Sequence, residues 1–141
     1  MKFGMEYKNQ SKSDFVKIAK ELAMSIECGD ILLMYGNLGA GKTYFTNKLC
    51  TALGVKTIVN SPSYVLLNEY VGKWNIYHYD LYRLNAADEV IELGIVERLN
   101  DGITIVEWPE LIEEYMPKKR IEIYFEHYDI KRNIKILNKE G

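Results

Sequence analysis

The pattern of apolar and polar positions in the first part of the chain alternates between helical and strand periods. A capping-box sequence, Ser11-x-x-Asp14, precedes apolar residues at helical spacing: Phe15, Ile18, Ala19, Leu22 and Ile26. The run Asp30 to Tyr35 then predicts a strand, and Tyr44 to Leu53 predicts a second helix that ends near Gly54. This alternation of helix and strand is typical of an α/β domain.

The later part of the chain is richer in strands. The runs Tyr64 to Val71 and Trp74 to Tyr79 flank Gly72-Lys73, which predicts a β-hairpin. Ile103 to Val106 is nearly continuous in apolar residues, as expected of a central strand that is covered on both faces. The other predicted elements are an edge strand (Phe3 to Tyr7), two short helices (Ala86 to Leu93, and Pro109 to Tyr115) and two final strands (Arg120 to Glu126 and Lys131 to Leu137) around a turn near Tyr128-Asp129.

These elements predict a single domain over residues 1–141. We expect a three-layer α/β fold like that of P-loop NTPases, with a central, mostly parallel sheet and antiparallel additions. In such a sheet the functional edge lies at the carboxyl ends of the central strands.

The loop between the first predicted central strand and its helix carries a complete G-x-x-x-x-G-K-T motif. Its residues are Gly36, Asn37, Leu38, Gly39, Ala40, Gly41, Lys42 and Thr43. The glycines let backbone N–H groups curl around the α- and β-phosphates of a nucleotide. Lys42 is expected to reach the β- and γ-phosphates, and Thr43 to hold Mg²⁺. The motif in this strand–helix context predicts binding of a nucleoside triphosphate with magnesium.

Two carboxylates at strand ends are candidates for the metal and water chemistry. Glu107 follows the buried-looking Ile103 to Val106 run, so we expect it beside the phosphates, binding Mg²⁺ directly or through water. Asp80 ends a strand whose alternation places His78 and Asp80 on one face. Because that strand looks half exposed, we place Asp80 farther from the centre, where it would orient the attacking water. A plain surface carboxylate remains the alternative for each, and a hydrogen-bonded strand histidine is the default interpretation of His78.

Two further features lie near the expected site. The segment Ser61-Pro62-Ser63-Tyr64 follows the phosphate-loop helix at the distance of a nucleotide-sensing switch, so the Ser63 hydroxyl is a candidate contact for the γ-phosphate or magnesium. A plain Ser-Pro turn fits the same residues equally well. Trp108 directly follows Glu107 and is expected at the rim of the site, or else in the core beneath the next helix.

Composition narrows the function. The chain has 18 basic and 20 acidic residues, so no basic excess points to direct nucleic-acid binding. Cys28 and Cys50 are not in a C-x-x-C pair, which argues against disulfide or zinc roles, and we expect both to be small buried residues in a reducing compartment. No signal peptide or membrane-length apolar run is recognisable, so we expect a cytoplasmic protein with no membrane association.

Three classes of phosphate-loop protein compete. A GTPase normally carries D-x-x-G and N-K-x-D elements, which this sequence lacks. A standalone small-molecule kinase needs an acceptor pocket and typically an arginine-bearing lid, whereas the arginines here are dispersed: Arg83, Arg98, Arg120 and Arg132. A switch-type ATPase, whose output is a nucleotide-dependent interaction with another protein, fits best, and the kinase remains the alternative.

The order and spacing of the motifs, from about residue 11 to 132, resemble those of the TsaE (YjeE) family of bacterial ATPases. The matching segments are the phosphate loop with Tyr35 before it, Ser61-Pro62-Ser63-Tyr64, His78-Tyr79-Asp80-Leu81-Tyr82-Arg83-Leu84, Leu93-Gly94-Ile95 and Val106-Glu107-Trp108-Pro109-Glu110. The phosphate loop alone is generic, but the H-x-D-L-Y-R and E-W-P elements beside it are specific. Ser63 stands where the family commonly has threonine, and this departure keeps the hydroxyl.

The resemblance implies a role for each of these residues. Thr43 and Glu107 would bind Mg²⁺, and the loop from Gly39 through Lys42 to Thr43 would bind the phosphates of ATP. Asp80 and Trp108 would be needed for hydrolysis, and the Ser-Pro segment would be the first switch. Ser11, Lys12 and Arg132 would contact the nucleotide.

The resemblance also implies a biological process, the synthesis of threonylcarbamoyladenosine (t6A) at position 37 of tRNAs. Family members do not transfer the threonylcarbamoyl group themselves. They join the TsaB–TsaD pair, in which TsaD is the transferase, and ATP hydrolysis by TsaE permits repeated turnover. The tRNA would then be reached only indirectly, through the complex, as the lack of a basic excess also suggests.

Overall fold

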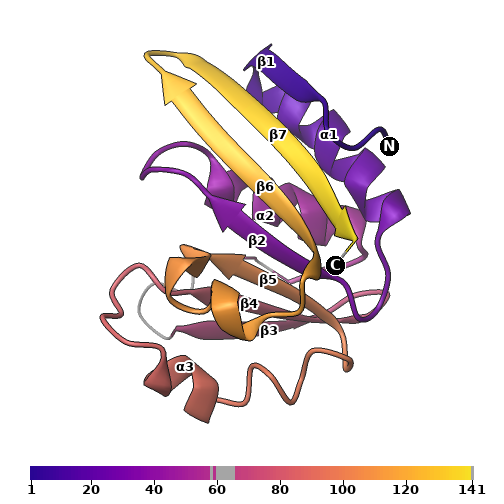
Figure 1. Ribbon diagram of the computed structural model, residues 1–141. Helices are drawn as coiled ribbons and strands as arrows, with labels where there is room; N and C mark the ends of the chain where they lie inside the picture. Colours follow the sequence, from indigo (N-terminus) through magenta and orange to yellow (C-terminus); the bar gives the residue numbers. More distant parts are fainter. Residues whose placement is uncertain (58, 60–65, 141) are drawn as a thin grey trace.

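A single mixed sheet organises the computed structural model, which describes residues 1–57, 59 and 66–140 (Figure 1). Within these residues the sheet has seven strands in the order β1-β7-β6-β2-β5-β4-β3. In chain order the elements are β1 (Glu6–Gln10), α1 (Lys12–Ser25), β2 (Ile31–Tyr35), α2 (Lys42–Ala52), β3 (Leu67–Val71), β4 (Asn75–Asp80), α3 (Asp88–Glu92), β5 (Ile103–Glu107), the 3₁₀ helices η1 (Pro109–Leu111) and η2 (Glu113–Tyr115), β6 (Lys119–Tyr128) and β7 (Lys131–Glu140).

The centre of the sheet is parallel and its two ends are antiparallel. Strand β2 pairs in parallel with both β5 and β6, and β4 pairs in parallel with β5. At the ends β3 is antiparallel to β4, β7 to β6, and β1 to β7. This confirms the predicted α/β fold class with a mostly parallel centre and antiparallel additions.

Helices α1 and α2 cover one face of the sheet, while α3, η1 and η2 lie on the opposite face (Figure 1). Strand β2 shows how the alternation of side chains serves both layers. Leu32 and Met34 join the core under α1 and α2, whereas Ile31 and Leu33 join the core that contains Val90 of α3. A strand buried on both faces must be apolar throughout, which explains the sequence of β2.

The start of α1 is determined by local chemistry. Ser11 Oγ accepts a hydrogen bond from the Asp14 backbone N–H at 3.2 Å, and the Asp14 carboxylate accepts one from the Ser11 N–H at 2.8 Å. These reciprocal bonds form the predicted capping box and satisfy two N–H groups that a helix start leaves unpaired.

Several sequence-based expectations differ from the structure. The edge strand covers Glu6–Gln10 instead of Phe3 to Tyr7, because the pairing of β1 with β7 sets its position. The segment predicted as one helix from Pro109 forms η1 and η2, with i→i+3 hydrogen bonds such as Ile112 N–H to Pro109 O. Cys28 is exposed in the turn before β2, although Cys50 is buried as expected.

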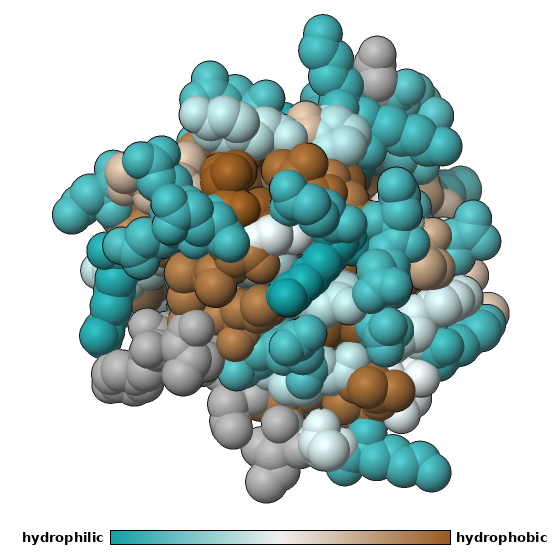
Figure 2. All heavy atoms as spheres, turned by 90° about the horizontal axis from the view of Figure 1, so that it is seen from below, coloured by the Kyte–Doolittle hydropathy of each residue, from teal (hydrophilic) through white to brown (hydrophobic). Residues whose placement is uncertain are grey.

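The side of the molecule below the view of Figure 1 carries a mixed surface. Figure 2 shows apolar side chains exposed there between polar ones.

Candidate functional site

A cavity of about 600 Å³ lies where the phosphate-loop motif meets the carboxyl ends of β4 and β5. Most of the site residues predicted from the sequence line it: Ser11, Lys12, Leu38, Gly39, Gly41, Lys42, Thr43, Asp80, Glu107, Trp108 and Arg132. The cavity occupies the edge at which α/β sheets bind ligands, because parallel strands bring their carboxyl ends together there.

Two glycines of the motif have no room for a side chain. Gly36 has φ +151°, and a Cβ there would lie 2.7 Å from the Phe125 carbonyl oxygen. Gly41 has φ +103°, and a Cβ there would lie 2.8 Å from a ring carbon of Phe15. The loop can therefore follow its path between β2 and α2 only with glycine at these positions.

Lys42 is the first residue of α2 and is buried, with 5 % of its surface exposed. Its ammonium donates a hydrogen bond to the Gly36 carbonyl oxygen and lies 3.6 Å from the centre of the Trp108 ring. Burial lowers the pKa of Lys42, and the nearby carboxylates of Glu107, Asp80 and Glu110 oppose that shift. The lysine is thus held inside the cavity by a carbonyl, an aromatic face and acidic neighbours.

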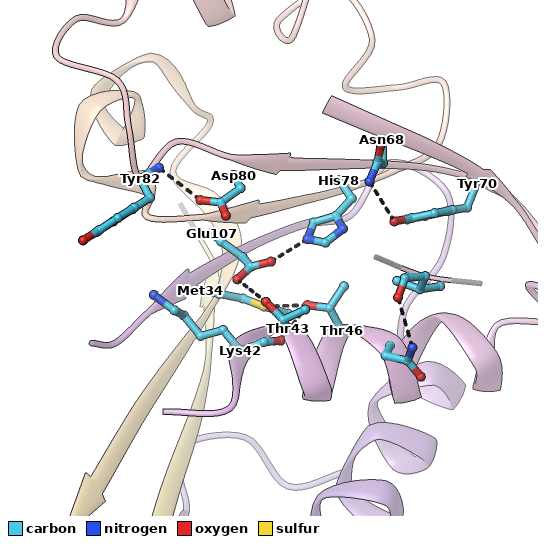
Figure 3. A network of polar contacts seen from close by, with 12 residues as sticks. Met34, Lys42, Thr43, Thr46, Asn68, Tyr70, His78, Asp80, Tyr82 and Glu107 are labelled. Carbon is cyan, nitrogen blue, oxygen red and sulfur yellow. Dashed lines mark hydrogen bonds and ion pairs between the residues drawn. The ribbon is translucent and has the colours of Figure 1, made fainter. Parts of the chain in front are cut away.

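A polar chain crosses the site from α2 through β5 to β4, as Figure 3 shows. The Thr43 hydroxyl donates to Glu107 Oε1 at 3.2 Å, and Glu107 Oε2 lies 2.6 Å from His78 Nε2. Glu107 is 2 % exposed and His78 is fully buried. Glu107 was expected beside the phosphates; it lies at the end of β5 in contact with the phosphate-loop threonine, and its role at magnesium stays a prediction. His78 is hydrogen-bonded, as the default interpretation of a strand histidine expected.

Asp80 lies next to Glu107 in the sheet, since the two residues pair in register between β4 and β5. One Asp80 carboxylate oxygen accepts a hydrogen bond from the Tyr82 N–H at 3.0 Å. The expectation that its strand is half exposed is wrong: five of the six residues of β4 are buried, Asp80 included. Strand β3 covers the outer edge of β4, and apolar clusters cover both of its faces.

Trp108 forms one wall of the cavity and has an uncommon backbone conformation. Its φ of +58° and ψ of +59° place it in the left-handed region immediately after β5. The indole is partly buried and contacts the Tyr82 ring, with ring centres 4.9 Å apart. The same indole ring also contacts the Lys42 ammonium. The sequence allowed Trp108 either at the rim of the site or in the core beneath the next helix, and the structure places it at the site.

The end of the cavity away from β5 combines the start of α1 with the β6–β7 turn. Ser11, Lys12 and Arg132 line this end, together with Asp129 and Ile130 of the turn. The hydroxyl and the backbone N–H of Ser11 are both engaged in the capping box of α1, so the Lys12 side chain is more available to a ligand at this end. Residues that are distant in the sequence thus meet at one end of the cavity.

Some predicted residues are not on the cavity wall. Gly36, Asn37 and Ala40 belong to the loop but do not line the cavity, and Gly36 borders a separate hollow with Tyr35 and Tyr124. Ser63, with the rest of the Ser-Pro segment, lies outside the described residues, so its predicted role stays a prediction.

The sequence analysis missed several wall residues: Gln10, Phe15, Tyr44, Tyr82, Asp129 and Ile130. Tyr82 lies in the H-x-D-L-Y-R element and could have been found there. Ile130 is 85 % exposed at a turn and carries no sequence signal for a binding role.

The donor atoms at the centre of the cavity suit a hard cation. The Thr43 hydroxyl and the Glu107 carboxylate are oxygen donors that already lie within 3.2 Å of each other, and Mg²⁺ prefers oxygen ligands. No group of three or more His, Cys, Asp or Glu residues able to hold a metal occurs among the described residues. The two side chains therefore fit an ion whose remaining ligands come from phosphate oxygens and water.

Fold and motif together define a class: α/β proteins in which a G-x-x-x-x-G-K-T loop joins a parallel strand to a helix at the carboxyl edge of the sheet. Within that class, the model of the family "threonylcarbamoyl adenosine biosynthesis protein TsaE" matches residues 9–134. The chain belongs to the TsaE family, a family of t6A biosynthesis proteins.

Individual relatives agree with this assignment. The chain is 40% identical over 121 residues to the tRNA threonylcarbamoyladenosine biosynthesis protein TsaE of Rickettsia conorii, a match that covers 84% of this chain and 69% of the relative. It is 39% identical to the TsaE of Bacillus subtilis, over 84% of this chain and 75% of the relative. The crystal structure of Bacillus subtilis YdiB superposes with a TM-score of 0.77 at 32% identity, over 97% of this chain and 86% of that chain.

Among the described residues, no helix is long and apolar enough to cross a membrane.

Proposed function

We propose that this protein binds ATP with Mg²⁺ in the 600 Å³ cavity and hydrolyses it, as an accessory ATPase of t6A synthesis that acts through a TsaB–TsaD complex. The observation that carries the proposal is the convergence of Lys42, Thr43 and Glu107 at one end of a cavity that a glycine-rich loop borders.

The nucleotide assignment is supported by charge and shape. A triphosphate at the loop would meet the backbone N–H groups of the first turn of α2, which has no side-chain cap. It would also meet the Lys42 ammonium, which is partly desolvated and therefore interacts strongly with an anion. The opposite end of the cavity, with Lys12, Tyr44 and Arg132, has polar and aromatic groups for the nucleoside.

Each residue then has a role in phosphoryl transfer to water. Thr43 and Glu107 would hold the magnesium ion, which neutralises phosphate charge when it is bound. Asp80, adjacent to Glu107 in the sheet, would orient the attacking water. Lys42 would stabilise charge on the phosphate oxygens, and Trp108 would position Lys42 and exclude bulk water from it.

The partner assignment rests on the family and on the balance of charge in the sequence. The charges of the whole chain are balanced, with 18 basic and 20 acidic residues. A protein of this kind would meet tRNA through partners that supply the RNA-binding surface and the transferase site.

A pull-down of purified TsaB and TsaD with this protein in ATP, ADP or no nucleotide tests the proposal. We expect a ternary complex whose yield depends on the nucleotide. If no complex forms with ATP, with ADP or without nucleotide, and the isolated chain phosphorylates a small metabolite, a standalone kinase is favoured instead.

A further inference from the structure

The contact between His78 and Glu107 gives His78 a defined polar role. Nε2 of His78 lies 2.6 Å from Glu107 Oε2, and the two side chains are almost completely removed from solvent. A carboxylate that binds Mg²⁺ is ionised and can only accept hydrogen bonds, so in the proposed metal-binding form the hydrogen of this contact belongs to Nε2.

The second ring nitrogen makes the role more specific. His78 Nδ1 is buried and has no hydrogen-bond partner among the described residues. A buried histidine that serves only the local structure would be expected to satisfy both nitrogens. Within the described part of the chain the ring makes one polar contact, and that contact is with a carboxylate of the proposed metal site.

The other oxygen of Glu107 shows what the contact achieves. Glu107 Oε1 accepts the hydrogen bond of the Thr43 hydroxyl at 3.2 Å, so the carboxylate is held at both oxygens, by α2 on one side and by β4 on the other (Figure 3). A carboxylate fixed at one oxygen has a defined orientation for the other, and residues that orient metal-binding carboxylates tune the affinity for the metal.

We propose that His78 is a positioning residue: its Nε2–H fixes the Glu107 carboxylate so that Oε1 faces Thr43, and thereby sets the affinity for the Mg²⁺ that accompanies the nucleotide. This inference rests on the proposed nucleotide function and deepens it. His78 itself touches neither nucleotide nor metal in this scheme.

Three substitutions at position 78 distinguish a His78 that orients Glu107 from a His78 that only packs in the core. His78→Gln can place an amide N–H at the same number of bonds from Cβ as Nε2, whereas His78→Asn reaches only the position of Nδ1. His78→Phe keeps a buried ring of similar shape and removes the donor. Tyr79→Phe is a matched control, because Tyr79 is also buried in β4 but faces the opposite core.

The measurement is ATP affinity by calorimetry, in excess EDTA and across a Mg²⁺ titration, for variants shown to be folded by their thermal transitions. We expect affinity in EDTA to stay within about twofold of wild type for every variant. The Mg²⁺ concentration for half-maximal enhancement should rise about tenfold or more in His78→Phe and His78→Asn, and by less than about threefold in His78→Gln and Tyr79→Phe. In the Glu107→Ala background, His78→Phe should have no further effect.

A rise below threefold in folded His78→Phe, or equal losses with and without magnesium, overturns the inference. If His78→Phe does not fold, the Gln and Asn variants decide, since equal magnesium dependence in the two contradicts a role for the Nε2 donor. Wild-type protein without any magnesium-dependent ATP binding would instead contradict the proposed function.

The tautomer provides a readout that needs no nucleotide. The chain has two histidines, so a His127→Gln variant labelled with ¹⁵N at histidine reports on His78 alone in long-range ¹H–¹⁵N spectra. We expect the hydrogen on Nε2 and a bare Nδ1. A neutral ring with its hydrogen on Nδ1 would overturn the inference.

Discussion

Lys42 illustrates how much one residue depends on its surroundings. The G-K-T sequence predicts a lysine aimed at phosphates, but the structure also buries it, against the Trp108 ring and the Gly36 carbonyl. A ligand phosphate would have to attract the ammonium away from, or share it with, these groups.

Loss of the Lys42 charge should therefore weaken nucleotide binding strongly. We use Lys42→Met, because methionine keeps an apolar stem beside Trp108. A lost charge-assisted contact should cost about 1.5–3 kcal/mol, so the Kd for Mg–ATP should rise at least about tenfold, with little change in thermal stability. Calorimetric titration checks this result, and an affinity within twofold of wild type would contradict the phosphate-loop assignment.

Glu107 and Asp80 are adjacent in the sheet, but their substitution should impair different properties of the protein. Glu107→Ala and Thr43→Ala should weaken magnesium-dependent nucleotide binding or turnover, because both contribute oxygens at the proposed metal position. Asp80→Ala should bind Mg–ATP and hydrolyse it poorly, since Asp80 is assigned to the water. The pair of assays is ATP binding with and without Mg²⁺ and steady-state hydrolysis. The opposite pattern, with binding lost in Asp80→Ala and both properties kept in Glu107→Ala, would exchange the two roles.

At the scale of elements, α1 shows that a short sequence signal can determine a boundary. Ser11 and Asp14 form their capping box from residues three positions apart, so no distant part of the chain is needed to begin the helix. Ser11→Ala should lower the free energy of unfolding by about 1 kcal/mol, measured by urea denaturation without nucleotide.

The capping box should also give the stability of α1 a defined pH dependence. The backbone N–H of Ser11 lowers the pKa of Asp14 below its ordinary value of 3.8, with a further contribution from the Ser11 hydroxyl. A lowered folded pKa contributes stability above 3.8 that is lost as the pH falls through the folded pKa. Asp14→Asn should thus lower the melting temperature at neutral pH, and the difference from wild type should shrink well below pH 3.8. A difference that stays constant over this range would exclude the charge of Asp14 as its cause.

Other boundaries followed from pairing between distant elements. The edge strand β1 is shifted toward Gln10 because its partner is β7, more than a hundred residues later in the chain. The burial of β4 depends in the same way on β3 and β5, which lie on either side of it. A strand that looks half exposed in sequence because it contains His78 and Asp80 can still be interior when its polar groups serve a buried site.

At the scale of the whole molecule, the proposed ATPase has few groups with which to complete a transition-state site alone. The described part of the site offers one lysine, Lys42, near the proposed γ-phosphate position, and Arg132 lies at the far end of the cavity. A TsaB–TsaD complex could close the site or add a group in trans.

We therefore expect slow ATP hydrolysis by the isolated protein and acceleration by TsaB–TsaD. Trp108 is the candidate that couples closure to hydrolysis, since it contacts both Lys42 and Tyr82 and has a strained left-handed backbone. Trp108→Ala should fold and bind ATP but show little stimulation in steady-state assays with the partner pair. Fast turnover without partners, or full stimulation of Trp108→Ala, would refute this coupling.

The sequence by itself determined the features that depend on neighbouring residues. The capping box, the glycine-rich loop between β2 and α2, the β3–β4 hairpin and the apolar strands β2 and β5 all follow from local spacing or from continuous burial, which leave clear patterns. The same patterns were enough to indicate the TsaE family, to which the chain belongs.

Only the tertiary structure decided which distant groups meet. Parallel pairing in register brings Asp80 beside Glu107 and lets His78 reach the carboxylate that also meets Thr43, and the β6–β7 turn brings Ile130 to the start of α1. These contacts depend on strand order and register, which single-residue chemistry does not encode. The physical reason is that local spacing determines which way a side chain points, whereas the packing of the whole sheet determines what it contacts.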